Sequence, residues 1–161
     1  MEGSNEIGEA CMRLAGYDAA YRDRLADIYH RMFTSIEWGF DWLTIENTRR
    51  YFTDMSRAPR CKGYIYLDSA DAIGCCFGEI SDYFNTVQYT IKEIFIDPLL
   101  QGKGLGSGFL REIESDLQKN KIDNVILSTS KSIKAFGFYK KNGYVESPET
   151  VFLVKFINHL R

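Results

Sequence analysis

A glycine-rich segment between a predicted strand and a predicted helix holds the residues whose spacing most clearly indicates chemistry. It reads EIFIDPLLQGKGLGSG from Glu93 to Gly108. Gly102, Gly104 and Gly106 allow the backbone to approach a ligand closely and to adopt positive φ. Because the helix that follows begins with free N–H groups and a partial positive charge, the segment predicts a phosphate-binding loop.

Two common phosphate-binding patterns do not fit this loop. The Walker pattern requires Ser or Thr after Gly-Lys, but Gly104 follows Gly102 and Lys103. The dinucleotide pattern G-x-G-x-x-G would place its third glycine at Ser107 or Phe109, depending on the starting residue. The sequence therefore argues against a nucleoside triphosphatase and against a dinucleotide site.

Composition leaves few residues for metal or triad chemistry. The chain has two histidines, His30 and His159, and its four cysteines lie at spacings that match no zinc pattern. We therefore expect reduced thiols and no metal site. A Ser-His-Asp hydrolase is also poorly supported, because so few histidines are present.

Length and charge restrict the class of protein further. The 161 residues suffice for one compact domain, which we expect to span residues 1–161. No apolar run reaches the roughly 18 residues that a membrane helix needs, and the acidic first twenty residues do not form a secretory signal. The net charge of −2 provides no whole-molecule attraction to nucleic acid. We expect a cytoplasmic protein that binds neither membranes nor nucleic acid.

Apolar periodicity predicts an alternating arrangement of strands and helices. Strands are expected at 9–14, 63–67, 73–81, 86–96, 125–129 and 151–157, and helices at about 18–34, 41–55, 105–121 and 132–141. The short connections between the second, third and fourth strands imply antiparallel pairing. The pattern therefore predicts a mixed sheet with helices on its faces.

Two motifs in this framework resemble the Gcn5-related N-acetyltransferase (GNAT) family. The pyrophosphate loop of that family reads Gln/Arg-x-x-Gly-x-Gly/Ala after a strand that ends near a proline, and Gln101, Gly104 and Gly106 match it. The segment from Ser132 to Tyr144 is similar to the family's Asn-x-x-Ala-x-x-Leu/Phe-Tyr-x-Lys-x-Gly-Phe/Tyr, with serine in place of the usual asparagine. The resemblance is clearest over residues 60–157.

The resemblance implies both a fold and a coenzyme site. The fold would be α/β (α+β), with a mixed, mostly antiparallel sheet of six to seven strands and about four helices. The coenzyme would be acetyl-CoA, and a backbone N–H near Phe95 or Ile96 would stabilise the oxyanion. The implied coenzyme-binding residues are Phe95, Ile96, Gln101, Gly102, Lys103, Gly104, Leu105, Gly106, Ser107, Ser132 and Phe136. Lys103 and the later lysines can equally be ordinary solvated side chains.

Transfer of an acetyl group to an amine also needs acid and base groups. An alkylamine is protonated at neutral pH and must lose a proton before it attacks a thioester. The resemblance assigns this proton to Glu93, directly or through water, with Glu79 and Asp82 as reserves, and it makes Tyr139 the acid that protonates the departing thiolate. The structural alternatives are a surface or ion-paired carboxylate and a packed core tyrosine.

Aromatic and acidic residues indicate the class of the acceptor. We expect Trp38, Asp41, Asp82 and Tyr83 to bind it, because aromatic rings and carboxylates suit a cationic amine. The predicted substrate is a small polyamine-like or aminoglycoside-like molecule. The alternatives are a protein N-terminus or lysine as acceptor, and a non-catalytic coenzyme A-binding sensor. The strand expected at 151–157 is a candidate edge for pairing with a second copy in a homodimer.

Overall fold

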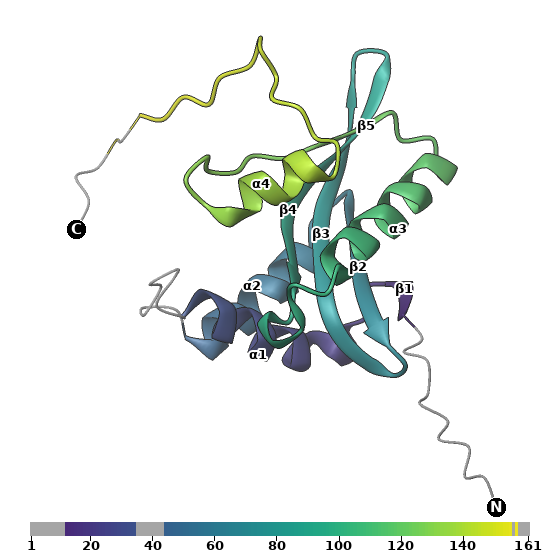
Figure 1. Ribbon diagram of the computed structural model, residues 1–161, viewed down its shortest axis with the longest axis vertical. Coiled ribbons are helices and arrows are strands. Elements are labelled where there is room, and N and C mark those ends of the chain that lie inside the picture. Colours follow the sequence, from purple (N-terminus) through teal and green to yellow (C-terminus); the bar gives the residue numbers. More distant parts are fainter. Residues whose placement is uncertain (1–11, 35–43, 156, 158–161) are drawn as a thin grey trace, which may run out of the picture. The chain divides into compact units, whose positions relative to one another are not determined.

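The computed structural model describes residues 12–34, 44–155 and 157, in two compact units, residues 1–127 and 128–161. The first unit contains β1 (Met12–Gly16), the 3₁₀ turn η1 (Ala19–Tyr21), α1 (Arg22–Phe33), α2 (Ile45–Arg57), β2 (Cys61–Asp68), β3 (Asp71–Tyr83), β4 (Thr86–Ile96), the 3₁₀ turn η2 (Pro98–Leu100), α3 (Leu105–Lys119) and β5 (Asn124–Ile126); the second contains α4 (Lys134–Lys141) (Figure 1).

One sheet organises the first unit. Its strands follow the order β1-β2-β3-β4-β5, with antiparallel pairing from β1 to β4 and a parallel pair of β4 with β5. The tight hairpins that join β2, β3 and β4 produce the antiparallel part, whereas the parallel pair needs the crossover through α3. The sheet therefore combines both kinds of pairing.

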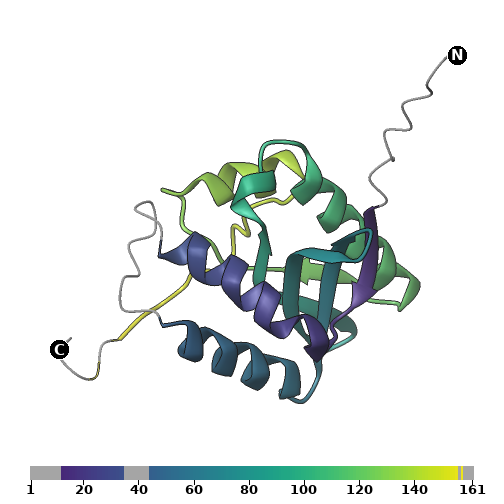
Figure 2. The same ribbon diagram turned by 90° about the horizontal axis from the view of Figure 1, so that it is seen from below.

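Helices cover both faces of this sheet. On one face, Leu25 and Ile28 of α1 and Phe52 of α2 form a core with Phe77 and Phe95 of the sheet, and α1 and α2 lie side by side in Figure 2. All of these side chains are at most 5% exposed, so their burial is a main source of stability.

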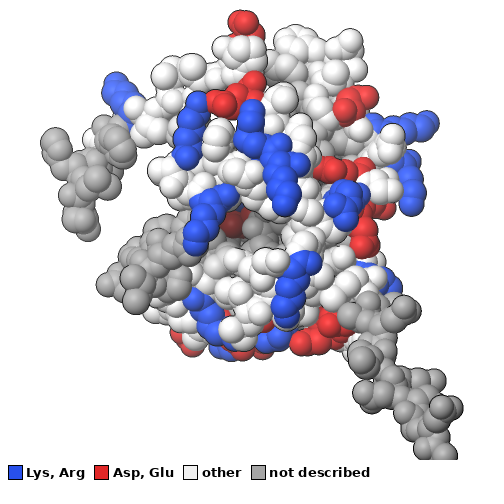
Figure 3. Space-filling view, in the orientation of Figure 1, with Lys and Arg blue, Asp and Glu red and all other residues white. Residues whose placement is uncertain are grey.

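On the opposite face, α3 packs through both stacking and polar contacts. The Phe109 ring stacks on Tyr66 with 4.9 Å between ring centroids, and the Tyr64 hydroxyl donates to Asp116 at 2.8 Å. The exposed side of α3 carries acids and bases next to one another, so the lysine excess over 98–141 does not make this surface uniformly basic (Figure 3).

Two adjacent cysteines show how β3 divides its side chains between the two faces. Cys75 belongs to the core under α1 and α2, whereas Cys76 contacts the Tyr89 hydroxyl at 3.6 Å. Both are buried thiols, and burial raises the pKa of each, that of Cys76 to about 12. They are therefore packing residues and not nucleophiles.

The second unit is built around α4. The helix ends at Gly143, whose φ of 91° is the left-handed conformation that glycine adopts at helix ends. The N–H of Gly143 donates to Lys140 and that of Tyr144 donates to Tyr139, so the last carbonyls are satisfied. The GNAT-like spacing of tyrosine and glycine here is therefore a helix with its C-cap.

The predicted α/β class and the mostly antiparallel sheet are confirmed, but the strand count is lower than expected. The described residues contain five strands and not six to seven. The segment expected as a strand at 151–157 has no strand pairing over 151–155, and its side chains from Val151 to Val154 are between 59% and 86% exposed. Apolar alternation predicted this strand, but a strand also needs a partner for its backbone groups. In the described part of the chain, no helix is long and apolar enough to cross a bilayer.

Gly74 tests the close packing between β3 and β4. A Cβ at this position would lie 2.7 Å from the carbonyl oxygen of Phe95, which cannot move away, and 2.5 Å from Ile96 Cδ1. We expect Gly74→Ala to lower the free energy of unfolding by about 1–3 kcal/mol in urea denaturation. Gly16→Ala is the control, because a Cβ there meets nothing within 4 Å. Equal effects of the two substitutions would contradict this packing.

Candidate active site

An extra residue in β4 shapes the centre of the site. Phe77 of β3 pairs with Glu93, but the next residue, Gly78, pairs with Ile91, so that Lys92 is the bulged residue. Because Glu93 lies opposite Phe77, its side chain is on the face covered by α1 and α2. The bulge therefore directs a carboxylate under the helices, as bulges beside active sites often do.

Two tyrosines from these helices hold the Glu93 carboxylate. The Tyr51 hydroxyl of α2 donates to Glu93 Oε1 at 2.7 Å, and the Tyr29 hydroxyl of α1 forms a second hydrogen bond with the carboxylate. Burial and the negative charge of Glu93 raise the pKa of both tyrosines, so they remain protonated donors. Tyr29 is 9% exposed and Tyr51 36%, so the site opens to solvent on the Tyr51 side.

The environment of Glu93 suits a general base. Burial raises the pKa of this carboxyl, and the hydrogen bonds from Tyr51 and Tyr29 oppose part of that increase. A carboxylate with a raised pKa accepts a proton more readily at neutral pH than an exposed one. The predicted base therefore lies where its pKa is moved toward the working range.

Next to Glu93, one edge of β4 is open within the first unit. The parallel pairing with β5 ends at Thr90, so the strand beyond it has no neighbour on that side. The Asp97 N–H donates to Ile73 of β3, whereas the carbonyl of Ile96 accepts from Gln101. Strand alternation then directs the Ile96 N–H to the open edge and the Phe95 N–H toward β3. Of the two predicted oxyanion donors, Ile96 is the one on the open side.

The glycine-rich loop after β4 presents free backbone to solvent. Gly102 and Gly104 have φ of 81° and 78°, and a Cβ at either would meet nothing within 4 Å. Gly104 is the N-cap of α3, where no side chain caps the helix and no acidic residue lies in the first turn. The N–H groups of Leu105, Gly106 and Ser107 are among those that a helix leaves unbonded at its start. The loop therefore fits an anion such as a diphosphate.

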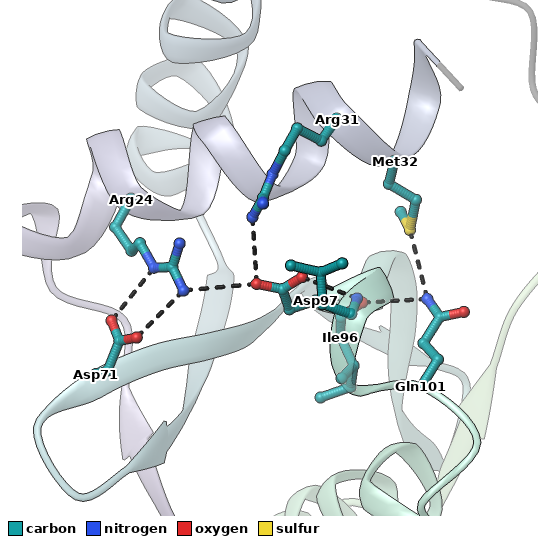
Figure 4. Close-up of polar contacts among 8 residues, drawn as sticks. Arg24, Arg31, Met32, Asp71, Ile96, Asp97 and Gln101 are labelled. Atoms are coloured by element: carbon teal, nitrogen blue, oxygen red, sulfur yellow. Dashed lines mark hydrogen bonds and ion pairs between the residues drawn. The ribbon is translucent and has the colours of Figure 1, made fainter. Parts of the chain in front are cut away.

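A buried carboxylate connects this loop to α1 (Figure 4). Asp97 is only 3% exposed, and its Oδ2 accepts from Arg31 at 3.2 Å and from Arg24 at 3.5 Å. Its Oδ1 accepts from the N–H of Leu99 at 3.1 Å, which begins the turn into the loop. The Gln101 amide completes the connection by donating to the Ile96 carbonyl at 3.2 Å. The predicted coenzyme residue Gln101 thus also supports the loop from within.

The remaining predicted coenzyme and acid residues belong to the second unit. Ser132 is exposed, and its hydroxyl lies 2.8 Å from that of Ser130. Phe136 and Tyr139 are half-buried residues of α4, and the Tyr139 ring lies 5.5 Å from that of Tyr144. These contacts place each residue within its own unit.

The predicted acceptor residues are not gathered around Glu93. Asp82 and Tyr83 lie at the far end of β3, where Asp82 pairs with Val87, six residues before Glu93 and so about 20 Å along the strand. Asp82 forms an ion pair with Arg60 at 2.6 Å, and Tyr83 is 59% exposed. Trp38 and Asp41 lie outside the described residues.

Sequence reasoning missed the roles of Tyr29, Tyr51 and Asp97. Tyr51 had a place in the predicted core of its helix, but nothing local indicates a contact with a glutamate 42 residues away. The Asp-Pro pair at Asp97 does signal a turn, since Asp commonly caps one, although its arginine partners are not visible from the pattern. In the described part of the chain, no three His, Cys, Asp or Glu side chains are grouped as metal ligands.

The comparison with protein families decides the class of this protein. Residues 59–146, more than half of the chain, match the model described as "Acetyltransferase (GNAT) domain". The chain belongs to the GNAT acetyltransferase family. It is an N-acetyltransferase, as the two motifs predicted, and acetyltransferases of this fold use acetyl-CoA. No curated protein matches the chain.

Solved structures show the same fold at low sequence identity. A possible acetyltransferase from Clostridium difficile 630 has a TM-score of 0.75 at 16% identity, over 91% of this chain and 99% of that chain. An aminoglycoside acetyltransferase from an uncultured soil metagenomic sample, in complex with sisomicin, has a TM-score of 0.71 at 10% identity, over 91% and 97%. A ribosomal-protein-alanine N-acetyltransferase from Brucella melitensis has a TM-score of 0.72 at 7% identity, over 91% and 99%. These acceptors differ widely, so the fold does not determine the substrate class.

Tyr51→Phe tests the hydrogen bond to the carboxylate. Without the hydroxyl, Glu93 loses a donor that favours its ionised form, so its pKa rises further. The base must be ionised to work, and we therefore expect the acidic limb of the kcat/KM profile to move up by about one pH unit. Tyr21→Phe is the control, because Tyr21 only packs against the core. An unmoved limb in Tyr51→Phe would show that this hydroxyl does not act on Glu93.

Asp97→Asn tests the attachment of the loop to α1. The amide keeps an acceptor for the N–H of Leu99 but removes the charge that pairs with Arg24 and Arg31. We expect the free energy of unfolding to fall by about 1–3 kcal/mol in urea, and the affinity for coenzyme A to weaken in calorimetry. Asp71→Asn is the matched control, because Asp71 also pairs with Arg24 but is largely exposed. The role of Asp97 is wrong if both variants behave alike.

Proposed function

We propose that this protein transfers the acetyl group of acetyl-CoA directly to the primary amine of a small cationic molecule. The observation that carries the proposal is the half-buried Glu93, which has a raised pKa, accepts a 2.7 Å hydrogen bond from Tyr51 and lies beside an open strand edge. A base at this position can take the proton that an ammonium group must lose before it reacts.

The loop and strand edge would bind the coenzyme. Backbone N–H groups from Gly102 to Ser107 suit the diphosphate, and the exposed Lys103 adds a positive charge beside it. Acetyl-CoA supplies the acetyl group as a reactive thioester. The Ile96 N–H, on the open edge of β4, is suited to stabilise the negative charge that develops on the acyl oxygen.

The proposed transfer balances with these residues. Glu93 accepts one proton from the ammonium, directly or through water, and the neutral nitrogen forms a bond to the acyl carbon as the carbon–sulfur bond breaks. Tyr139 would return a proton to the departing thiolate, so that free coenzyme A and the N-acetylated amine are the products. The assignment of Tyr139 rests on its position in the family motif.

A small cationic acceptor fits the chemistry around Glu93. An ammonium group pairs with the carboxylate and with the faces of Tyr29 and Tyr51, whose rings lie 6.2 Å apart. The sisomicin complex of the aminoglycoside acetyltransferase neighbour supports this class, and the ribosomal-protein-alanine neighbour supports a protein acceptor as the second candidate.

We also propose a cytoplasmic location and a single functional domain. Cys61, Cys75 and Cys76 are free thiols, as expected in a reducing compartment. The match to one domain model over 59–146 supports the second proposal.

The experiment combines coenzyme binding with turnover. Calorimetry should detect coenzyme A, and acetyl-CoA with a panel of amines should release thiol. Glu93→Gln should lower kcat by about 10²–10⁴-fold with coenzyme affinity retained, and Tyr139→Phe should also lower kcat. Asp54→Asn, an exposed carboxylate of α2, is the control.

Three results would contradict the proposal in different ways. Unchanged turnover in both variants would refute the assigned base and acid. An absence of heat with coenzyme A would refute the loop as its site. Tight coenzyme binding without turnover of any amine or peptide would favour a coenzyme A-binding sensor.

A further inference from the structure

A groove adjoins the carboxylate of Glu93 on its open side. It has a volume of about 250 Å³ and lies between the end of α2, the start of β2 and the bulge of β4. Its lining residues are Tyr51, Met55, Ala58, Cys61, Gly78, Glu79 and Lys92. We call this the Tyr51 groove, because Tyr51 is both part of its wall and the donor to Glu93.

The bulge and the helix period together produce this groove. Lys92, the extra residue of β4, lines it on the side of Glu93, and Gly78 on the paired strand adds no side chain to fill it. On α2, Tyr51 and Met55 lie four residues apart and therefore share one face of the helix, which continues to the cap residue Ala58. An acceptor with its nitrogen at Glu93 would thus reach the groove with its next few atoms.

The groove offers no free charge to such an acceptor. Met55, Ala58 and Gly78 are apolar, and the Cys61 thiol has a pKa raised by burial, so it stays neutral. Its two charged residues pair with each other, with Lys92 Nζ 3.6 Å from Glu79. A second ammonium group entering the groove would meet this lysine, whereas an uncharged arm would bury apolar surface.

We infer that the Tyr51 groove binds a short apolar arm of the acceptor, so that the preferred substrate is a primary amine that carries such an arm on a chain of a few carbons. The inference rests on the proposed function and narrows it. The volume is below the roughly 300–1,000 Å³ typical of sites for drug-sized ligands, so it suits a single ring or a short branched chain. A larger polycationic acceptor fits neither the size nor the charge of the groove.

Phenethylamine and ethylamine measure this preference directly. Both present a primary ammonium to Glu93, but only phenethylamine has a ring for the groove. We expect kcat/KM for phenethylamine to exceed that for ethylamine by at least about tenfold, mainly through KM. Putrescine, an aminoglycoside and short peptides complete the panel.

Two substitutions of Ala58 connect the preference to the groove. Ala58 is exposed and has an extended backbone at the end of α2, where larger side chains are tolerated. Ala58→Phe should fill the groove and lower the phenethylamine-to-ethylamine ratio about tenfold or more. Ala58→Asp should shift preference from phenethylamine toward putrescine, because the new carboxylate attracts its second ammonium. Arg57→Phe, which adds the same ring one residue away and outside the lining, should leave the ratio unchanged.

The outcomes separate this inference from the proposed function. Turnover of amines with a ratio near one, or with a ratio that Ala58→Phe and Ala58→Asp leave unchanged, would overturn the inference alone. Preference for an aminoglycoside, a polyamine or a peptide over phenethylamine in the natural protein would also overturn it. Failure to acetylate any amine would instead overturn the proposed function.

Discussion

The extra residue in β4 is the constraint on which the rest of the site depends. Side chains of a strand alternate between faces, so a shift of one residue reverses the direction of every side chain that follows. With Lys92 unpaired, Glu93 and Phe95 fall on the face of α1 and α2, where the tyrosines and the aromatic core await them. The pairing of β4 with β5 ends just before this point, which leaves the following edge of β4 open within the first unit. One irregularity therefore directs the base and precedes the edge beside it.

The buried Asp97 has a comparable role at the end of the same strand. A carboxylate removed from water is costly unless charged and hydrogen-bonding partners surround it, and here two arginines of α1 and the N–H of Leu99 provide them. These contacts make sense of a charged residue in a position that is otherwise apolar. They also join the glycine loop to the helix that carries Tyr29, so that both sides of the site share one support (Figure 4).

Patterns within short stretches of sequence predicted much of this arrangement. The alternation over 86–96 matches β4 (Thr86–Ile96), and the glycines at 102 and 104 adopt the positive φ that their spacing suggested. Contacts between distant segments were not predictable in this way. Tyr51 and Glu93 meet only because α2 crosses the sheet over the bulge, and the bulge has no sequence signal of its own. The segment 151–157 shows the opposite error, because its alternation is strand-like but no partner strand pairs with it over 151–155.

The adjacent thiols of β3 give the sheet an internal record of its own opening. A thiol reacts with alkylating or oxidising reagents as the thiolate, and with raised pKa values and complete burial Cys75 and Cys76 have almost none at neutral pH. Reagents gain access to them only when the central strands separate from the helices above and below. Because one thiol faces the α1 and α2 core and the other faces Tyr89, their rates of modification report separately on the loss of the two layers.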